Sequence, residues 1–372
     1  MNIPLLDLKR EFAEIRDEVY AGWAGVFESM QILKGANLKA FEQEVAQYLG
    51  ARHVVGVASG TDSLTLGLIA AGIGPGDEVV MQANAFAAAV EAAVIAGATP
   101  VPVDIRESDL GPNLDQLADA ITDRTKAVLV VHLHGLPVDV QPILDLIEPR
   151  GILLIEDASH AHGALYRGRK AGTFGEVGCF SCGPVKSLGC YGDGGFIATN
   201  DPAVAEKVRL LQAHGQARKN EHQLYGFNSR LDELQAVVLR AKLKRLDRRN
   251  ALRVQHADRY NAAFKPLGLG TPPTPPGRTS AYHQYVVRTP QREALAAFLK
   301  ERGIGTGVHY NYPIHQQPRW TPTWGTSPSL PVSEKVATEM LSLPVFPDLT
   351  EAEVNYVIGS VKAFVEKEGA HA

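Results

Sequence analysis

Short apolar runs and amphipathic stretches alternate along the first part of the chain. Residues 37–50, NLKAFEQEVAQYLG, carry apolar side chains at helical spacing and end on a glycine, which predicts a helix with a glycine stop. The run HVVGVAS (53–59) predicts a strand, and SGTDSLTLGLIAAG predicts a helix with polar capping residues at its start. Four further runs predict strands: EVVMQ (78–82), TPVPVD (99–104), AVLVVHLHG (127–135) and ILLIED (152–157). Helical segments separate these strands, so the pattern predicts an α/β fold with a mostly parallel sheet flanked by helices.

The pattern changes in the last third of the chain. A long charged amphipathic stretch, residues 229–264, predicts a helix with a break and leads to the proline-rich segment TPPTPPGR (271–278). Beyond it, AYHQYVVRT predicts a strand, and QREALAAFLKERG and TEAEVNYVIGSVKAFVEKE predict helices. We therefore expect a large domain over residues 1–245 and a small α+β domain over residues 246–372.

Composition excludes some classes of function. A chain of 372 residues with 45% hydrophobic and 21% charged residues can bury a sizeable core. Its net charge of -4 leaves no basic surplus for a phosphate backbone, which argues against nucleic-acid binding. The N-terminus has no cationic stretch leading into an apolar one, and no run of about 18 apolar residues occurs, so we expect a cytoplasmic protein without a membrane span.

The three cysteines, Cys179, Cys182 and Cys190, lie within a single stretch and are odd in number, which does not suggest a secreted disulfide framework. Their Cys-x-x-Cys spacing leaves zinc or redox chemistry open, but zinc needs two further ligands, and His160 and His162 lie on a separate segment. We favour buried thiols that pack around a tight loop, and we expect no metal.

Polar residues stand where the predicted strands stop. In open parallel sheets, ligands bind beyond the carboxyl ends of the strands, so these positions are expected to converge on one site. They are Ser59 to Asp62, Asn84, His132, Asp157 and Ser181.

Gly60 and Thr61 follow a strand and open a helix, where free N–H groups and the helix dipole attract an anion. As an alternative, they are ordinary capping residues. The segment GIGPGD (72–77) follows a helix and contains a proline, so we interpret it as a loop, and no P-loop motif occurs.

Lys186 in CFSCGPVKSLGCYGDGGF has no charged neighbour until Asp193 and lies among small and apolar residues. It is either a solvated surface charge or a desolvated amine with a lowered pKa and increased nucleophilicity. Asp157 is either a helix cap or a carboxylate that faces a site. Pyridoxal phosphate uses such a set together, since it needs a lysine, an acid for its ring nitrogen, an aromatic face and an anion cradle.

Motifs along nearly the whole chain resemble the DegT/StrS family of pyridoxal-phosphate-dependent sugar aminotransferases, which share the fold of aspartate aminotransferase. The matching segments are ILKGANLKAFEQEVAQYLG, SGTDSL, VVHLHGLPVD, IEDASHAHGA, FSCGPVKSLGCYGDGG, GFNSRLDELQA and GVHYNYPIHQQP. The chain departs from the family at His134, where an aromatic residue is usual, and at Cys182-Gly183, where a bulkier pair is common.

The resemblance implies a role for each of several residues. Lys186 would bind pyridoxal 5'-phosphate as an imine and carry protons, and Asp157 would pair with the ring nitrogen. Phe86 would stack on the ring, unless it is a plain core residue, and His160 falls where many members have a glutamine near the phenolic oxygen. The phosphate would be held by Gly60, Thr61, Ser181 and, from the neighbouring subunit of a homodimer, Asn228.

The late motif implies that His309, Tyr310 and His315 lie near the substrate, and the glycines of the loop at 192–195 would allow the backbone to approach cofactor and substrate. The expected activity is a transamination in two stages through pyridoxamine phosphate. It would move an amino group from an amino acid, L-glutamate or L-glutamine, to a keto group of a nucleotide-linked sugar. LGCYGDGG favours carbon 3 of a hexose, while the nucleotide stays open and a cyclitol ketone is an alternative.

Two other functions stay open at this point. Relatives with this fold act as pyridoxamine-dependent sugar dehydratases, but in them the lysine is replaced by histidine, so Lys186 favours amino transfer. A regulatory protein that binds the cofactor without catalysis is the other alternative.

Overall fold

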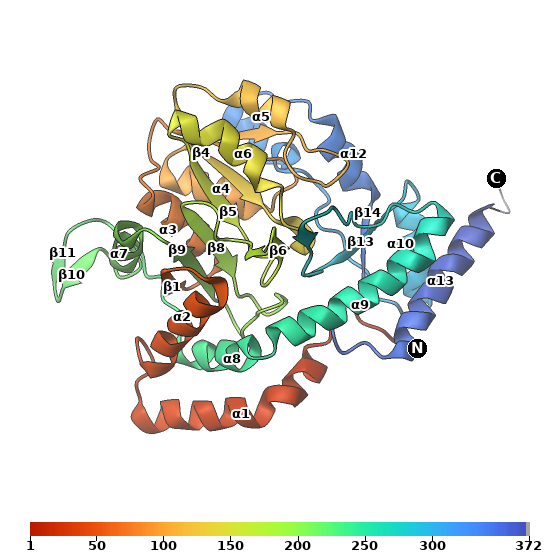
Figure 1. Ribbon diagram of the computed structural model, residues 1–372, viewed down its shortest axis with the longest axis horizontal. Coiled ribbons are helices and arrows are strands. Elements are labelled where there is room, and N and C mark those ends of the chain that lie inside the picture. Colours follow the sequence, from red (N-terminus) through yellow and green to blue (C-terminus); the bar gives the residue numbers. More distant parts are fainter. Residues whose placement is uncertain (370–372) are drawn as a thin grey trace.

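A seven-stranded sheet forms the centre of the larger part of the computed structural model, which describes residues 1–369 (Figure 1). The strands lie in the order β1 (His53–Val57), β9 (Gly195–Thr199), β8 (Val177–Ser181), β5 (Leu153–Asp157), β4 (Thr125–Val131), β2 (Glu78–Gln82) and β3 (Thr99–Val103). The five strands from β8 to β3 are parallel, and β9 is antiparallel to both of its neighbours. The prediction of a mostly parallel sheet is confirmed.

Helices cover both faces of this sheet. One face packs against α3 (Gly60–Ala70), α4 (Ala87–Ala96) and α7 (Pro202–Leu211), and the other against α2 (Ala36–Leu49), α5 (Leu114–Ala120), α6 (Val140–Ile147) and α8 (Glu233–Leu243). Val79 and Met81 pack with the first group, while Val80 between them packs with the second. Because both faces are buried, the strands appear in the sequence as unbroken apolar runs.

The strand predicted over 127–135 is wrong in its last four residues, because β4 ends at Val131. Leu133–Gly135 form a tight turn in which His134 has a φ of 59°, and this turn brings the chain over the end of the sheet. The long helix predicted over 229–264 is confirmed with its break, as α8 and α9 (Leu246–Phe264), although α8 begins at Glu233.

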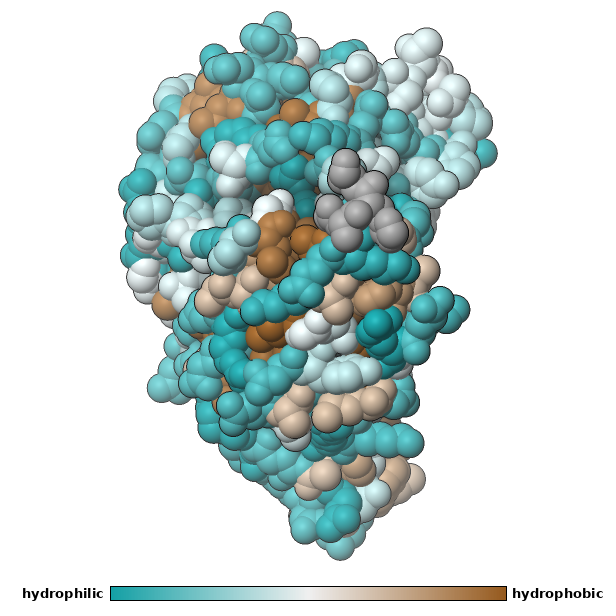
Figure 2. Space-filling model, turned by 90° about the vertical axis from the view of Figure 1, so that its right-hand side faces the viewer, coloured by the Kyte–Doolittle hydropathy of each residue, from teal (hydrophilic) through white to brown (hydrophobic). Residues whose placement is uncertain are grey.

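The second, smaller unit packs around α9, which runs from the sheet toward the C-terminal helix in Figure 1. Its other elements are β13 (Tyr285–Arg288), α10 (Arg292–Glu301), α11 (Trp320–Trp324), α12 (Pro331–Glu339), β14 (Met340–Leu343) and α13 (Glu351–Gly369). Its core contains the stacked rings of Tyr260 and Phe264. Figure 2 views the molecule from this end, where a mainly hydrophilic surface surrounds smaller apolar patches.

Two-residue and three-residue strands complete the structure. β6 (Leu165–Tyr166), β7 (Arg169–Lys170) and β12 (Arg278–Thr279) form one small sheet, and β10 (Gln216–Arg218) pairs with β11 (Glu221–His222). No helix among the described residues has both the length and the apolar character that crossing a membrane requires.

A buried carboxylate fixes the carboxyl end of β5. Glu156 is completely buried and accepts hydrogen bonds from His132 Nε2 at 2.9 Å and from the backbone N–H groups of Gly172, Phe174 and Gly175 at 2.6–2.8 Å. Burial opposes ionisation, but these donors and His132 hold the pKa of Glu156 below its ordinary value. The next residue in the strand, Asp157, is thereby held in a fixed position.

The N-terminal residues belong structurally to the smaller unit. Ile3 donates to the Gly303 carbonyl and accepts from Gly305, both at 2.8 Å. At the start of α1 (Leu8–Ser29), Arg10 donates to both carboxylate oxygens of Glu353 on α13, at 2.7 and 2.8 Å. The boundary at residue 245 stays a prediction, while the first residues of the chain lie across it.

We expect Glu353→Gln to lower the free energy of unfolding at pH 7 by about 1–2 kcal/mol, since charge-assisted bonds are lost at a partly exposed site. The hydrogen bonds from Arg10 lower the pKa of Glu353 from 4.5 to about 2. Because the folded-state pKa is the lower one, the contribution is complete above the unfolded-state pKa and disappears as pH falls through the folded-state pKa. Denaturant unfolding of both proteins between pH 7 and pH 3 measures this, and a difference that does not shrink at acid pH contradicts it.

Candidate active site

A cavity of about 200 Å³, which we call the lysine pocket, opens at the carboxyl ends of β4, β5 and β8. Nine of the candidate residues from the sequence line it, although they come from distant parts of the chain: Ser59, Gly60, Thr61, Phe86, Asp157, His160, Ser181, Lys186 and Tyr310. The expected convergence of the strand ends on one site therefore holds for this set.

Lys186 lies in the turn that follows β8, where its backbone N–H donates to the Gly183 carbonyl at 2.9 Å. Burial lowers the pKa of its ammonium below the ordinary value, and the negative charge of Asp157 opposes this only in part. A larger share of neutral amine is present near neutral pH than in an exposed lysine, so the side chain is suited to act as a nucleophile and a proton carrier.

Asp157 ends β5 and is 6% exposed. One carboxylate oxygen, Oδ1, accepts a hydrogen bond from the Ser159 backbone N–H at 3.0 Å, but turns follow β5, so the alternative of a helix cap is wrong. The residue also lines the lysine pocket. It can therefore cap the turn and at the same time present negative charge to a ligand.

The start of α3 lies where we predicted an anion cradle. Ser59 caps the helix, because its hydroxyl accepts from the Asp62 backbone N–H at 3.0 Å. A Cβ placed on Gly60 would lie 2.4 Å from the Cβ and 2.9 Å from the Oγ of Ser181, so only glycine lets the helix start approach β8 this closely. The result is a concave site made of backbone N–H groups and a serine hydroxyl, which suits a phosphate.

The imidazole of His160 is neutral, and its hydrogen bonds show which ring nitrogen carries the proton. Its Nδ1 accepts from the His134 backbone N–H at 3.3 Å, which leaves Nε2 to carry the proton. Burial and the nearby charge of Lys186 lower the pKa of His160 well below its ordinary value, and the ring of His283 lies 4.5 Å away. The side chain thus offers one N–H donor, the same function that a glutamine amide provides.

Phe86 and Tyr310 form an aromatic wall. Their ring centroids are 5.1 Å apart with planes inclined by 38°. Phe86 is 51% exposed, so the alternative that it is a plain core residue does not hold. An exposed ring at the edge of a pocket is a surface that a planar ligand can cover.

Three predicted site residues lie elsewhere in the structure. His309 lines a neighbouring cavity and shares a hydrogen bond with Ser342 Oγ at 2.8 Å. His315 does not line the lysine pocket and bonds to Glu334 at 3.1 Å, so its expected place near the substrate stays a prediction. Asn228 lies on an exposed segment, where a role toward a second subunit stays a prediction.

The glycines of the loop at 192–195 are explained by contacts inside the chain. A Cβ on Gly195 would lie 2.4 Å from the Ser59 carbonyl oxygen, and one on Gly194 would lie 2.9 Å from Leu231. Glycine at these positions lets the loop and the start of β9 pack closely against Ser59 and against Leu231, which precedes α8. The interpretation that these glycines also serve the approach of a ligand stays a prediction, and Asp193 of the same loop lines the pocket.

The three cysteines are buried free thiols, as expected. Burial raises the pKa of Cys190 to about 11, which makes it a poor nucleophile. Within residues 1–369, no group of three or more His, Cys, Asp or Glu side chains is arranged to hold a metal ion.

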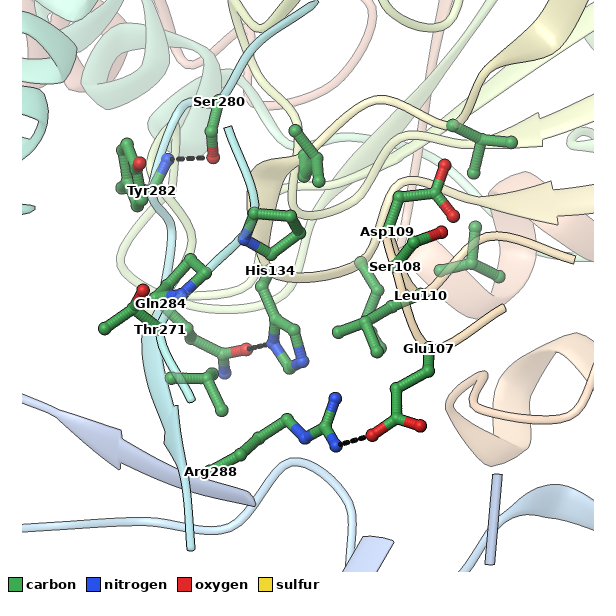
Figure 3. A pocket seen from close by; sticks show the side chains of 17 residues that line it. Glu107, Ser108, Asp109, Leu110, His134, Thr271, Ser280, Tyr282, Gln284 and Arg288 are labelled. Atoms are coloured by element: carbon green, nitrogen blue, oxygen red, sulfur yellow. Dashed lines mark hydrogen bonds and ion pairs between the residues drawn. The ribbon is translucent and has the colours of Figure 1, made fainter. Parts of the chain in front are cut away.

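Sequence reasoning missed the polar residues that the smaller unit contributes. His134 Nδ1 bonds to Gln284 Oε1 at 2.7 Å at one side of a second cavity, which shares Val131 and Leu133 with the lysine pocket (Figure 3). In the same view Arg288 is paired with Glu107. His283 and Gln284 follow no recognisable motif, so only the fold brings them to the site.

Residues 13–362 match the DegT/DnrJ/EryC1/StrS aminotransferase family. The chain is 43% identical over 368 residues to a dTDP-3-amino-3,4,6-trideoxy-alpha-D-glucose transaminase of Streptomyces venezuelae, with coverage of 98% of this chain and 97% of that protein. It is 40% identical over 367 residues to a protein of Geobacillus stearothermophilus named pleiotropic regulatory protein, with coverage of 98% and 99%. The crystal structure of S. venezuelae DesV in complex with a ketimine intermediate matches with a TM-score of 0.96 at 42% identity, covering 98% of this chain and 99% of that one.

The lowered pKa of Lys186 predicts selective labelling in ligand-free protein. An amine-selective reagent should modify Lys186 at a lower pH than the exposed Lys300, and Asp157→Asn should lower the labelling midpoint further, because the charge that favours the ammonium is removed. Mass spectrometry of each labelled peptide across a pH series measures both effects. A midpoint for Lys186 at or above that of Lys300 contradicts the prediction.

Proposed function

The chain belongs to the DegT/DnrJ/EryC1/StrS aminotransferase family, and we propose that it transfers an amino group from an amino acid to a keto group of a nucleotide-linked sugar with pyridoxal 5'-phosphate as cofactor. One observation carries this proposal: Lys186, Asp157, an exposed aromatic ring and an anion cradle line a single pocket. The similarity to a dTDP-sugar transaminase supports it.

The residues present fit the cofactor. The cradle of Gly60 and Ser181 suits its phosphate, Asp157 suits a protonated ring nitrogen, and Phe86 offers a flat apolar face. His160 Nε2 offers a donor for the phenolic oxygen. When bound, pyridoxal phosphate supplies a ring that accepts electrons from a carbon next to the transferred nitrogen, and pyridoxamine phosphate carries the amino group between the two stages.

The chain itself supplies binding and proton transfer. Lys186 Nζ takes a proton from the donor carbon that bears the amino group and returns protons during the second stage, for which a lowered pKa is suited. The Asp157 carboxylate would keep positive charge on the ring nitrogen of a bound cofactor, because a buried anion favours the protonated form of a neighbouring base. Tyr310 and Phe86 form a wall that limits the entry of water.

The acceptor we propose is a 3-keto hexose, and the donor is L-glutamate or L-glutamine. The loop sequence LGCYGDGG supports position 3, as does the name of the Streptomyces venezuelae relative, a transaminase of a 3-amino sugar. We place the enzyme in the cytoplasm, which the three free thiols support.

A homodimer with shared active sites is also part of the proposal. Large apolar side chains are exposed on two segments of the chain: Phe27 (53%) and Met30 (67%) on the first, and Tyr225 (102%), three positions before Asn228, on the second. The two segments run toward each other, because Leu33 pairs with Asp232. Exposed apolar side chains of this size support contact with a second copy of the chain.

The experiments below must also distinguish the aminotransferase from two alternative functions. A pyridoxamine-dependent dehydratase is disfavoured by Lys186, since that branch has histidine there. A regulatory role draws support from the name of the Geobacillus stearothermophilus relative, but a cofactor-binding sensor would not turn over an amino donor.

We expect Lys186→Ala to lose covalent capture of pyridoxal phosphate by borohydride and to lose turnover of L-glutamate by at least about 10²–10⁴-fold. Asp157→Asn should fold normally but slow the same turnover by about 10²-fold or more. Mass spectrometry and the visible absorbance of the cofactor give the two readouts, and Lys300→Ala is the matched control. Retained capture or turnover in Lys186→Ala would sink the assignment.

Subunit mixing tests the shared site. Asn228→Asp places a carboxylate where the partner's phosphate is expected, so this variant and Lys186→Ala should each be inactive alone. Mixed dimers would contain one intact site, so an unfolded and refolded equal mixture should regain about a quarter of wild-type turnover. Light scattering checks the dimer mass, and the absence of any regained activity means that Asn228 does not act across subunits.

A further inference from the structure

A third cavity, which we call the arginine cavity, lies next to the lysine pocket. It has a volume of about 130 Å³ and is bounded by the N-terminal Leu5 and Leu6, by the end of β14, and by Val185, the residue before Lys186. Its polar lining consists of Arg253, His283, Gln284, His309 and Ser342, and the remaining lining residues are apolar.

Arg253 is a buried arginine without a bonded carboxylate. It is 3% exposed, and its Nε and Nη1 groups have no hydrogen-bond partner among residues 1–369. Two other buried cations are paired: Lys242 with Glu11 and Arg249 with Asp348, each at 2.7 Å. A buried guanidinium with unused donors has a strong physical reason to bind an anion.

The positive charge of Arg253 persists at neutral pH. Burial lowers its pKa to about 10, which still leaves the guanidinium protonated, and the charges of Glu11 and Asp348 favour that form without bonding to it. A planar guanidinium matches the geometry of a carboxylate with two parallel hydrogen bonds.

The arginine cavity adjoins the reacting amine. His283, on its wall, has its ring centroid 4.5 Å from that of His160 in the lysine pocket. His309 and His283 are both neutral rings, because burial and the charge of Lys186 lower the pKa of each. A ligand that occupies both cavities would thus have an anionic end near Arg253 and its other end near Lys186.

The charges lining the three neighbouring cavities differ. The lysine pocket includes Asp157 and Asp193, and the cavity of Figure 3 includes Glu107 and Asp109. No aspartate or glutamate lines the arginine cavity. Arg288, the cation of the Figure 3 cavity, is already bonded to Glu339 at 2.9 Å. An anionic group is therefore most favoured in the arginine cavity.

We propose that Arg253 binds a carboxylate of the amino acid donor, so that the arginine cavity is the donor subsite of the enzyme. This inference rests on the proposed function, which requires an amino acid to approach Lys186. The guanidinium orients the donor by its carboxylate while the donor amine faces the lysine pocket.

Binding of succinate, a dicarboxylate without an amino group, to the holoenzyme tests the proposal without catalysis. Isothermal titration calorimetry should show affinity that falls about 10–100-fold in Arg253→Met and less in Arg253→Lys, as expected for loss of a charge-assisted hydrogen bond. Arg288→Met is the matched control and should bind succinate like the wild type. Equal affinity of Arg253→Met and wild type would overturn the proposal.

A measurement on the wild type covers the case in which Arg253→Met fails to fold. In ¹⁵N-labelled holoenzyme, NMR should show that succinate shifts the guanidinium Nε–H signal of Arg253, assigned by its absence in Arg253→Lys, but not that of Arg288. An unshifted Arg253 signal at saturating succinate would also overturn the donor subsite. Either negative result leaves capture of pyridoxal phosphate by Lys186 intact, whereas loss of that capture in the wild type would count against the proposed function itself.

Discussion

Burial at the carboxyl ends of parallel strands is the constraint on which the electrostatics of the site depend. Burial disfavours the positive charge of Lys186 and Asp157 favours it, so a larger share of neutral amine is present than in an exposed lysine. Burial first, and the charge of Lys186 second, lower the pKa of His160, His283 and His309. Neutral rings keep one donor and one acceptor nitrogen each, and this is what lets His160 accept from the His134 backbone and still offer a proton to a ligand.

Two adjacent carboxylates in β5 have different roles, because one stabilises the fold and the other faces the candidate site. Glu156 and Asp157 are neighbours in β5, and the alternation of the strand points them in opposite directions. Glu156 accepts four hydrogen bonds and locks the loop at 172–175 against the strand. Asp157 accepts a single backbone bond and keeps capacity for a ligand. The hydrogen bonds of Glu156 fix the end of β5, and they therefore also fix the position of Asp157.

The sequence alone was sufficient for the parts of the site that lie at strand ends and helix starts. Apolar runs locate the strands, and the residues that follow them, such as Asp157 and Lys186, converge because parallel strands share one edge. It was insufficient for the smaller unit, whose residues reach the site through domain packing. In the sequence, Arg253 is one of many charged residues in a charged helix. Only the packing of α9 in the structure shows that its guanidinium is buried without a hydrogen-bonded carboxylate. Nor does the local sequence pattern show the bond of His315 to Glu334, which follows from the packing of α12.

An aminotransferase binds two chemically different substrates, an amino donor and a keto acceptor, next to the same lysine. The charged residues around Lys186 are distributed in a way that suits both substrates. An amino acid donor brings a carboxylate, which the aspartates of the lysine pocket and the acidic residues of the Figure 3 cavity would repel. A keto sugar brings hydroxyl and carbonyl groups at its reacting end, for which aspartates and neutral histidines are suitable hydrogen-bond partners. If Arg253 holds the donor carboxylate, the donor is bound by a contact that the reacting end of the keto sugar does not use. The two substrates can then share the amine of Lys186 while different side chains select each of them.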